Sequence, residues 1–276
     1  MTSSDDFDDD DLWAHLGPER SATLKALTQR LGRSANLITL RERSVTAPSA
    51  SAIGGPAWRP DNSVAWPKDD RGVAMMHLAR LNFAEMPPLE NFPPSGLLQF
   101  FISTEDIVLG ADKPHGQGFL LEWWPSPGGG IAVPQPPLDE DGGEGTPLAG
   151  GTMEDTIHDN GRGISFSPGI VPAGADDPEV SAALQEMLGI DPDGDDMHYA
   201  AQDLSAGAPD AWVGGLPYSA QSSAAEADDL VLLQIGNGEN DAFMWGGDVG
   251  AATFLIAPAD LIARRFEAAI YDASGF

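Results

Sequence analysis

The chain has 276 residues, of which 42% are hydrophobic, a net charge of −29 at pH 7 and no cysteine. Such a negative charge repels phosphate backbones and anionic lipid surfaces, so it argues against nucleic-acid and membrane partners, and it suits cations or a basic protein partner. The lack of cysteine excludes disulfides, thiolate metal sites and cysteine nucleophiles. Because the sequence shows neither a signal peptide nor an apolar run near the roughly 20 residues of a membrane span, we expect a soluble cytoplasmic protein.

The N-terminal residues 1–11 are rich in aspartate, at positions 5, 6 and 8–11. A block of like charges predicts a disordered acidic tail, and the alternative is an arm that competes for a basic surface. Leucines at helical spacing then predict a helix from Asp11 to Arg30. Pro18 should divide this helix and Gly32 should end it.

Short apolar runs bounded by glycine and proline predict several strands further along the chain. The first covers residues 36–45, where Arg41 and Arg43 share one face that is either solvated or an anion site. Further strands are predicted at residues 75–83, 97–103, 118–124 and 164–166. Residues 125–160 are rich in glycine, proline and acidic side chains and predict a loop.

Two amphipathic helices are predicted in the second half of the chain. One covers residues 178–189, which begin with a proline and end with a glycine. The other is a terminal helix over residues 259–271, begun by Pro258.

An internal repeat organises these elements. The glycine-led run at 96–102 is echoed at 250–256, with glycine, aromatic and isoleucine residues at the same offsets. Gly96 follows Leu81 by 15 positions, and Gly250 follows Ile235 by the same 15. Each half also begins with a glycine pair, so the halves cover about residues 50–125 and 205–270.

The same residues carry a family resemblance. Gly54-Gly55-Pro56, Trp66-Pro67, Leu78-Ala79-Arg80-Leu81-Asn82 and Gly96-Leu97-Leu98-Gln99-Phe100-Phe101 resemble the YwqG-like family, bacterial proteins with no assigned function. The second half matches this family through Leu232-Leu233-Gln234-Ile235 and Met244-Trp245-Gly246-Gly247-Asp248. Arg80 stands where that family usually has glutamine, and Gly247 is an extra residue. The resemblance implies a compact, mainly β fold and supplies no catalytic residues.

These observations predict a mainly β (α+β) fold. A single compact domain over residues 12–276 would consist of two pseudo-repeated antiparallel halves, joined by the loop at 125–160, with a few peripheral helices that include N- and C-terminal ones. The oligomeric state is left open.

Candidate ligand-binding residues are tryptophans and polar residues near turns. Trp58 and Trp66, beside prolines, either pack as rigid plugs over a core or line a groove. Trp245 and Asp248 either form a tight turn or lie at the mouth of a pocket between the halves. Arg80 is a further candidate ligand-binding residue.

An acidic turn at residues 191–196 is the candidate metal site. Asp191, Asp193 and Asp195 fit the first ligand positions of a calcium loop, but neither the turn glycine nor the final glutamate follows, so an ordinary acidic turn is the alternative. No other cofactor is indicated. The five histidines lack metal-ligand spacing, and we expect His77, in an apolar strand, to be structural.

The sequence contains no nucleophile elbow, P-loop or dinucleotide fingerprint. The favoured hypothesis is therefore a non-catalytic binding protein that recognises a basic protein partner, as toxin-neutralising immunity proteins do. The alternatives are a hydrolase-like enzyme with carboxylates between the halves and a Ca²⁺-binding protein; catalytic residues are not identified.

Overall fold

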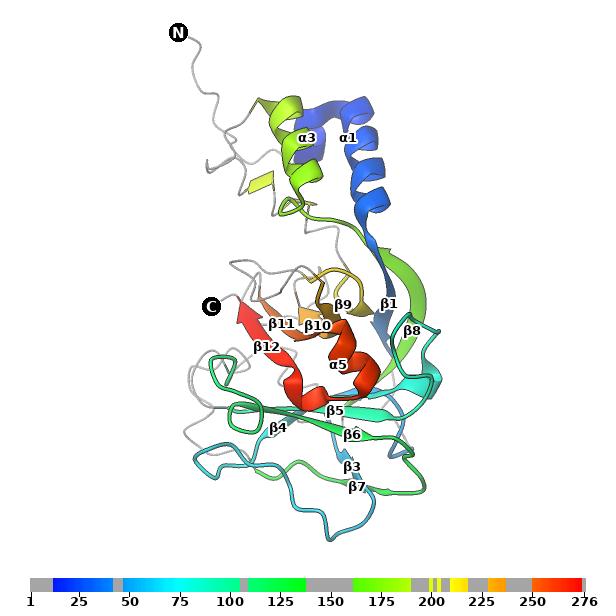
Figure 1. Ribbon diagram of the computed structural model, residues 1–276, viewed down its shortest axis with the longest axis vertical. Coiled ribbons are helices and arrows are strands. Elements are labelled where there is room, and N and C mark those ends of the chain that lie inside the picture. Colours follow the sequence, from blue (N-terminus) through cyan, green and yellow to red (C-terminus); the bar gives the residue numbers. More distant parts are fainter. Residues whose placement is uncertain are drawn as a thin grey trace. The chain divides into compact units, whose positions relative to one another are not determined.

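The computed structural model describes residues 12–41, 47–104, 109–137, 161–189, 199–200, 203–204, 209–217, 228–236 and 250–274. The chain divides into two compact units. The helical unit is drawn from Met1–Arg33 and Ile170–Ala208, and the β unit from Ser34–Gly169 and Pro209–Phe276. The predicted mainly β fold with helices near both ends of the chain is confirmed (Figure 1). The β unit carries the sheet, whereas the N-terminal helix belongs to the smaller unit.

Two helices dominate the described part of the helical unit, α1 (Leu12–Leu31) and α3 (Pro178–Leu188). Gly17 has φ 71° inside α1, so the predicted division next to Pro18 is confirmed. Asp177 caps α3 through its carboxylate, which accepts the backbone N–H of Glu179 at 2.8 Å, and a left-handed Gly189 ends the helix. The predicted helix over 178–189 is thus confirmed.

The β unit contains a ten-stranded sheet in the order β12-β11-β10-β9-β1-β8-β2-β4-β5-β6. Its strands are β1 (Arg33–Leu40), β2 (Ala52–Ile53), β4 (Met76–Asn82), β5 (Leu97–Ile102), β6 (Phe119–Trp124), β8 (Arg162–Val171), β9 (Ala211–Gly214), β10 (Leu230–Gly236), β11 (Ala251–Ile256) and β12 (Ile270–Ser274). Two further strands, β3 (Ala57–Arg59) and β7 (Ile131–Val133), form a separate ribbon. The remaining elements are α5 (Pro258–Ala263) and the 3₁₀ turns η1 (Phe83–Glu85) and η4 (Phe266–Ala268).

The strand order has the same pattern on both sides of its centre. From β1 outward lie β9, β10, β11 and β12, and from β8 outward lie β2, β4, β5 and β6. β1, which precedes β2 in the chain, therefore pairs with β9, and β8, which precedes β9, pairs with β2. Each side of the sheet thus contains one strand from the other half of the sequence.

The hairpins β4–β5 and β10–β11 share one register. Met76 pairs with Ile102 and Leu230 with Ile256, and every later pair is related by the same offset of 154 positions. The ladder is also interrupted at equivalent places, between His77 and Ala79 in β4 and between Val231 and Leu233 in β10. A bulge bends and twists its strand, so the two hairpins have matching irregularities as well as matching pairs.

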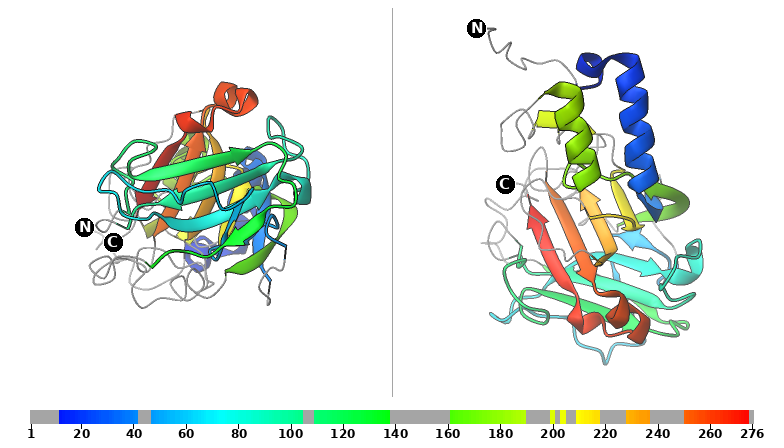
Figure 2. Two further views of the ribbon diagram at one scale, coloured as in Figure 1. Left: turned by 90° about the horizontal axis from the view of Figure 1, so that it is seen from below. Right: turned by 45° about the horizontal axis from the view of Figure 1, so that its top comes forward.

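Aromatic side chains join the two ends of the sheet across the core. The ring of Phe254 lies 4.9 Å from that of Phe100 and is stacked at 4.5 Å on Tyr271, and Phe119 lies 5.7 Å from Tyr271. The arms β4–β5–β6 and β10–β11–β12 consequently face one another and give the β unit a nearly barrel-like section (Figures 1 and 2). The faces turned toward this core supply most of the buried apolar residues.

The predicted terminal helix over residues 259–271 is wrong in its second part. α5 ends at Ala263, because Arg264 takes a left-handed φ of 61°. Ile270 then opens β12, which pairs with β11 and buries Tyr271 against the core. The apolar residues at the end of the predicted helix fit both a helical and an alternating spacing. They were assigned to the helical period, whereas the structure has the alternating period of a strand.

Candidate functional site

Polar side chains line the face of β4–β5–β6 that points away from the core. Arg80 pairs with Gln99, and Gln99 with Glu122, so these three residues form one row across neighbouring strands and share a face. Arg80 and Gln99 are buried despite their polarity. We define the buried polar cluster as this row together with Arg59 of β3 and His77 of β4.

The ribbon β3–β7 covers this row and is held by two glutamine side chains. The Gln99 amide accepts the backbone N–H of Trp58 at 2.7 Å and donates to the Trp58 carbonyl at 3.1 Å, as a further strand would. Gln135, just after β7, accepts the His77 N–H at 2.8 Å and donates to the Met75 carbonyl at 3.2 Å. The bond from the His77 N–H satisfies the main chain at the β4 bulge, where the ladder is interrupted.

An ion pair lies beneath the ribbon. Arg59 Nη1 donates to Glu122 Oε2 at 2.6 Å, and the two side chains are 1% and 17% exposed. Burial raises the pKa of Glu122 above its ordinary value, although Arg59 and Gln99 oppose the shift. Burial likewise lowers the pKa of Arg59, with Glu122 opposing. Each charge therefore depends on the other for its stability in the interior.

His77 is held in its neutral form. Its Nδ1 lies 2.9 Å from the Gly55 carbonyl, which can only accept, so Nδ1 carries the proton and Nε2 presents a lone pair. Burial, assisted by the nearby positive charges of Arg80 and Arg59, lowers the pKa of His77 to about 3. Among the residues that the structure describes, Nε2 has no hydrogen-bond partner. His77 therefore has the expected structural hydrogen bond at Nδ1 but not at Nε2.

The depressed pKa of His77 predicts a loss of stability in mild acid. The unfolded chain binds the histidine proton from pH 6.5 downward, whereas the folded chain does so only near pH 3, so the contribution is present above pH 6.5 and lost as the pH falls. We expect wild type to lose about 2 kcal/mol more than His77→Gln between about pH 7 and 5, because each pKa unit is worth about 1.4 kcal/mol. Urea unfolding at each pH measures this difference, and parallel curves for the two proteins would contradict it.

Arg80 binds main-chain oxygens instead of presenting its charge to solvent. Its Nε donates to the Ala50 carbonyl at 2.7 Å and its Nη1 to the Pro56 carbonyl at 2.6 Å. Burial lowers its pKa to about 10, and the charge of Glu85 opposes the shift. Arg80 thus fixes the loop between β2 and β3, where Gly54 and Gly55 both have positive φ.

The second half of the sheet contains an equivalent row. Gln234 pairs with Thr253, and Thr253 with Asp272, at the positions that correspond to Arg80, Gln99 and Glu122. Gln234 and Thr253 are buried as well. This row has no arginine, so the charge of Asp272 is not balanced within it, whereas Arg80 and Glu122 have opposite charges in the first row.

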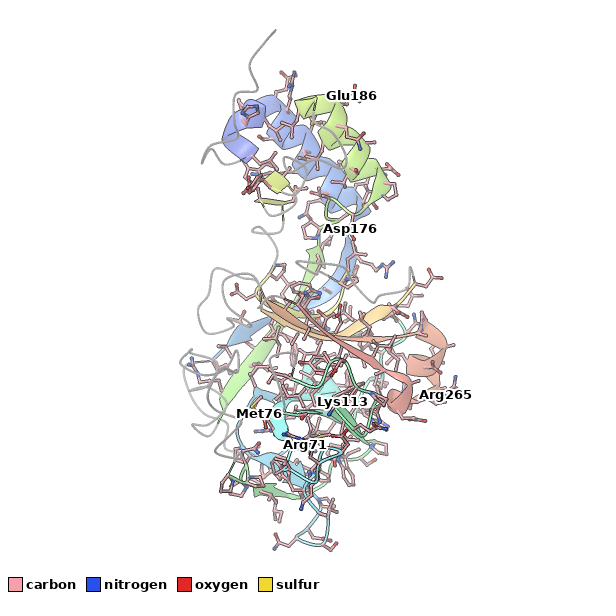
Figure 3. All side chains as sticks on the ribbon, turned by 90° about the vertical axis from the view of Figure 1, so that its left-hand side faces the viewer. Arg71, Met76, Lys113, Asp176, Glu186 and Arg265 are labelled. Carbon is pink, nitrogen blue, oxygen red and sulfur yellow. The ribbon has the colours of Figure 1, made fainter. Side chains whose placement is uncertain are left out.

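Another buried carboxylate, that of Asp69, forms its hydrogen bonds mainly with residues of its own loop. Asp69 accepts from the backbone N–H groups of Arg71 and Val73 and from the Ser103 hydroxyl, and it forms an ion pair with the Arg71 side chain at 2.9 Å. Burial alone would raise the pKa of Asp69, but these hydrogen bonds hold it below its ordinary value. The loop beside it is held through Lys113, whose Nζ lies 3.1 Å from Asp70; Figure 3 shows Arg71 and Lys113. This arrangement is suited to fixing loops.

The structure brings three of the five predicted ligand-binding residues together. Trp58, in the ribbon strand β3, is only 3% exposed, as a tryptophan that packs as a plug would be. Trp66 is half-buried, donates its indole N–H to the Met75 carbonyl at 2.8 Å and packs edge-on against Phe101. With Arg80 they surround the outer face of β4 and β5. The other two predicted residues, Trp245 and Asp248, lie outside the described residues.

The proposed calcium ligands Asp191, Asp193 and Asp195 also lie outside the described residues, so that site stays a prediction. Within the described ranges, no group of three or more histidine, aspartate or glutamate side chains could hold a metal ion. No helix of the described part is both long and apolar enough to cross a membrane. Arg41 is exposed, and Arg43 is not among the described residues.

Sequence reasoning missed Arg59, Gln99, Glu122 and Gln135 as site residues. A signal was present for two of them, because Gln99 and Glu122 each interrupt an otherwise apolar strand. A polar residue in a strand buried on both faces needs a partner, and it therefore predicts a second layer over the sheet. Arg59 and Gln135 gave no such signal, since β3 and β7 are only three residues long.

The fold defines a mainly β protein with a two-armed antiparallel sheet. Its candidate site consists of polar residues on the outer faces of these sheet strands. The chain belongs to the DUF1963 family, a domain of unknown function, whose model matches residues 51–274. No curated protein shows significant similarity to the chain.

Proposed function

We propose that the protein is a non-catalytic binding protein whose acidic surface recognises a basic protein partner, in the manner of immunity proteins. The observation that carries this proposal is the excess of acidic over basic residues. The chain has 43 acidic and 14 basic residues, and burial removes Asp69 and Asp229 as well as Arg59 and Arg80 from the described surface. The surface therefore keeps the negative charge that the composition indicates, and complementary charge accelerates and selects encounters with a basic protein.

The buried polar cluster supports a scaffold role for the polar residues of the first half. Gln99, Gln135 and Arg80 direct their hydrogen bonds to main-chain groups of the loops around them. A catalytic group needs a free atom that can reach a substrate. The enzyme alternative depends on Asp248 and carboxylates between the halves, and no described contact favours it.

The two halves of the sheet are, in this proposal, products of an internal duplication. The shared register and the equivalent bulges of β4–β5 and β10–β11 support it, since neither follows from strand composition alone. The likeness of residues 50–105 and 210–270 to the YwqG-like family is proposed to reflect common descent. Duplication would give the protein two related outer faces of different charge.

Salt-dependent capture tests the proposed partner. The protein is immobilised and exposed to native lysate at about 0.05 M and 0.5 M salt, since added salt screens exposed charges. A basic protein that binds at the lower salt and is released at the higher one is expected, and its purified form should bind in titration. If nothing binds in either condition, the proposal is wrong and screening of small molecules follows.

Charge-neutral variants locate the binding face. One variant carries Glu90→Gln, Asp112→Asn and Glu267→Gln in the β unit, where all three side chains are exposed. Its matched control carries the same number of changes in the helical unit, at the exposed residues Glu19, Asp176 and Glu186 (Figure 3). We expect the first set to weaken binding more than the second, because most of the residues that the family model matches, 51–274, belong to the β unit. Equal binding by both variants and wild type would contradict electrostatic recognition.

A further inference from the structure

Only one of the three guanidinium nitrogens of Arg59 forms hydrogen bonds with described residues. Its Nη1 donates to Glu122 at 2.6 Å and to the Trp58 carbonyl at 3.0 Å. Its Nε and Nη2 are buried and have no hydrogen-bond partner among the described residues. The side chain is 1% exposed, so bulk water does not solvate these two donors. Unpaired donors of a buried cation are costly and call for a specific explanation.

The two unpaired nitrogens form one edge of the guanidinium. Nε and Nη2 point in parallel directions, and this edge binds the two oxygens of a carboxylate or phosphate as a bidentate pair. The opposite part of the group is already committed to Glu122. The part of Arg59 that is best suited to an oxyanion therefore forms no hydrogen bond with the described residues.

Two aromatic rings and a second buried arginine lie near the Arg59 guanidinium. The guanidinium carbon lies 5.4 Å from the centre of the Trp66 ring and 5.2 Å from that of Phe101, so two aromatic faces orient it. Arg80 adds a second buried positive charge to the buried polar cluster, and His77 is neutral there. Glu122 forms the ion pair with Arg59, whereas the carboxylate that acts on Arg80 is Glu85.

We propose that the Nε–Nη2 edge of Arg59 binds a small oxyanion of the carboxylate or phosphate class beneath the ribbon β3–β7. Arg59 belongs to β3, and its side chain lies against Glu122 and Phe101 of the sheet, so the ribbon that carries it has to separate locally from the sheet to admit the anion. Its strands are three residues each, and the exposed Gly128 and Gly129 precede β7 with open space around them. Short pairings of this kind open locally at low free-energy cost. This site is independent of the proposed basic partner, which needs only the outer acidic surface.

Arginine side-chain NMR tests the site in the unmodified protein. The Nε–H signal of Arg59, assigned by through-bond correlation with the backbone resonances of Arg59, is followed while inorganic phosphate and, separately, acetate are added. We expect a saturable downfield shift with at least one of them, and acetate against phosphate distinguishes a carboxylate from a phosphate ligand. If the signal moves with neither anion, the edge is occupied by buried water only and the proposal is wrong.

Calorimetry with matched variants provides the second measurement. Arg59→Lys keeps the charge but lacks the edge, and we expect it to weaken binding of the effective anion at least tenfold. Arg30→Lys is the control, since Arg30 forms an exposed ion pair with Glu179 in the helical unit, and it should bind as wild type does. Unchanged affinity in Arg59→Lys would overturn the proposal, and should that variant not fold, the wild-type NMR titration decides.

Discussion

Replacing Arg59 with methionine should destabilise the β unit by about 3–5 kcal/mol at pH 7. The substitution leaves the Glu122 carboxylate, 17% exposed, without its charged partner, and an unpaired buried charge costs this much. Burial already raises the pKa of Glu122 in the intact pair. The penalty should therefore shrink as the pH falls toward 4.5, the ordinary value, because a protonated glutamate needs no cation.

Urea unfolding followed by tryptophan fluorescence measures this loss, since Trp58, Trp66 and Trp124 all lie near the pair. The double variant Arg59→Met/Glu122→Gln should recover most of the stability by removing the stranded charge. Arg30→Met, which breaks the exposed pair with Glu179, should cost less than about 1 kcal/mol. A loss of that small size at Arg59 would show that Glu122 remains hydrated without it.

Replacing Phe254 with alanine should cost about 3–5 kcal/mol, the usual range for removing a large aromatic side chain from a packed core. Phe254 is fully buried, and its ring contacts Phe100 and Phe119 from one arm of the sheet and Tyr271 from the other. The cavity would lie where the two arms meet, so both arms lose packing at once.

Thermal and urea unfolding measure the effect. Ile270→Ala serves as a control, because Ile270 opens β12 next to Tyr271 but is 40% exposed, and it should change stability by less than about 1 kcal/mol. Phe254→Leu should fall between the two, since it keeps part of the volume. If Phe254→Ala cost no more than Ile270→Ala, the arms would not depend on this contact.

The sequence predicted the strands that contain long apolar runs. β4, β5 and β6 begin and end within about two residues of their predicted bounds, and β11 coincides with the run at 250–256 that echoes residues 96–102. Their hydrophobic patterns specify these strands locally. β3 and β7 were not predicted, since strands of three residues carry no period and gain their stability from the row that they cover. The first two residues of β12, Ile270 and Tyr271, were assigned to the terminal helix because their pairing partner, β11, is visible only in the fold.

The ligand-binding roles of Trp58, Trp66 and Arg80 stay a prediction. The structure places these three residues around one face of the sheet. Their chemistry could not be predicted, because it depends on Arg59 meeting Glu122, which is 63 positions away. Contacts at such separations are set by strand order, and strand order has no local signal in a sequence.

The exchange of β1 and β8 across the centre of the sheet has a consequence for how the protein is made. β1 ends at Leu40, but its neighbours are β8, which begins at Arg162, and β9, which begins at Ala211. During synthesis the first half of the chain therefore emerges with the inner edge of β2 unpaired and β1 without a partner. Such edges invite pairing with other chains. Assembly of the sheet centre has to wait until most of the chain has left the ribosome, and nascent chains stalled between these points would be the aggregation-prone species.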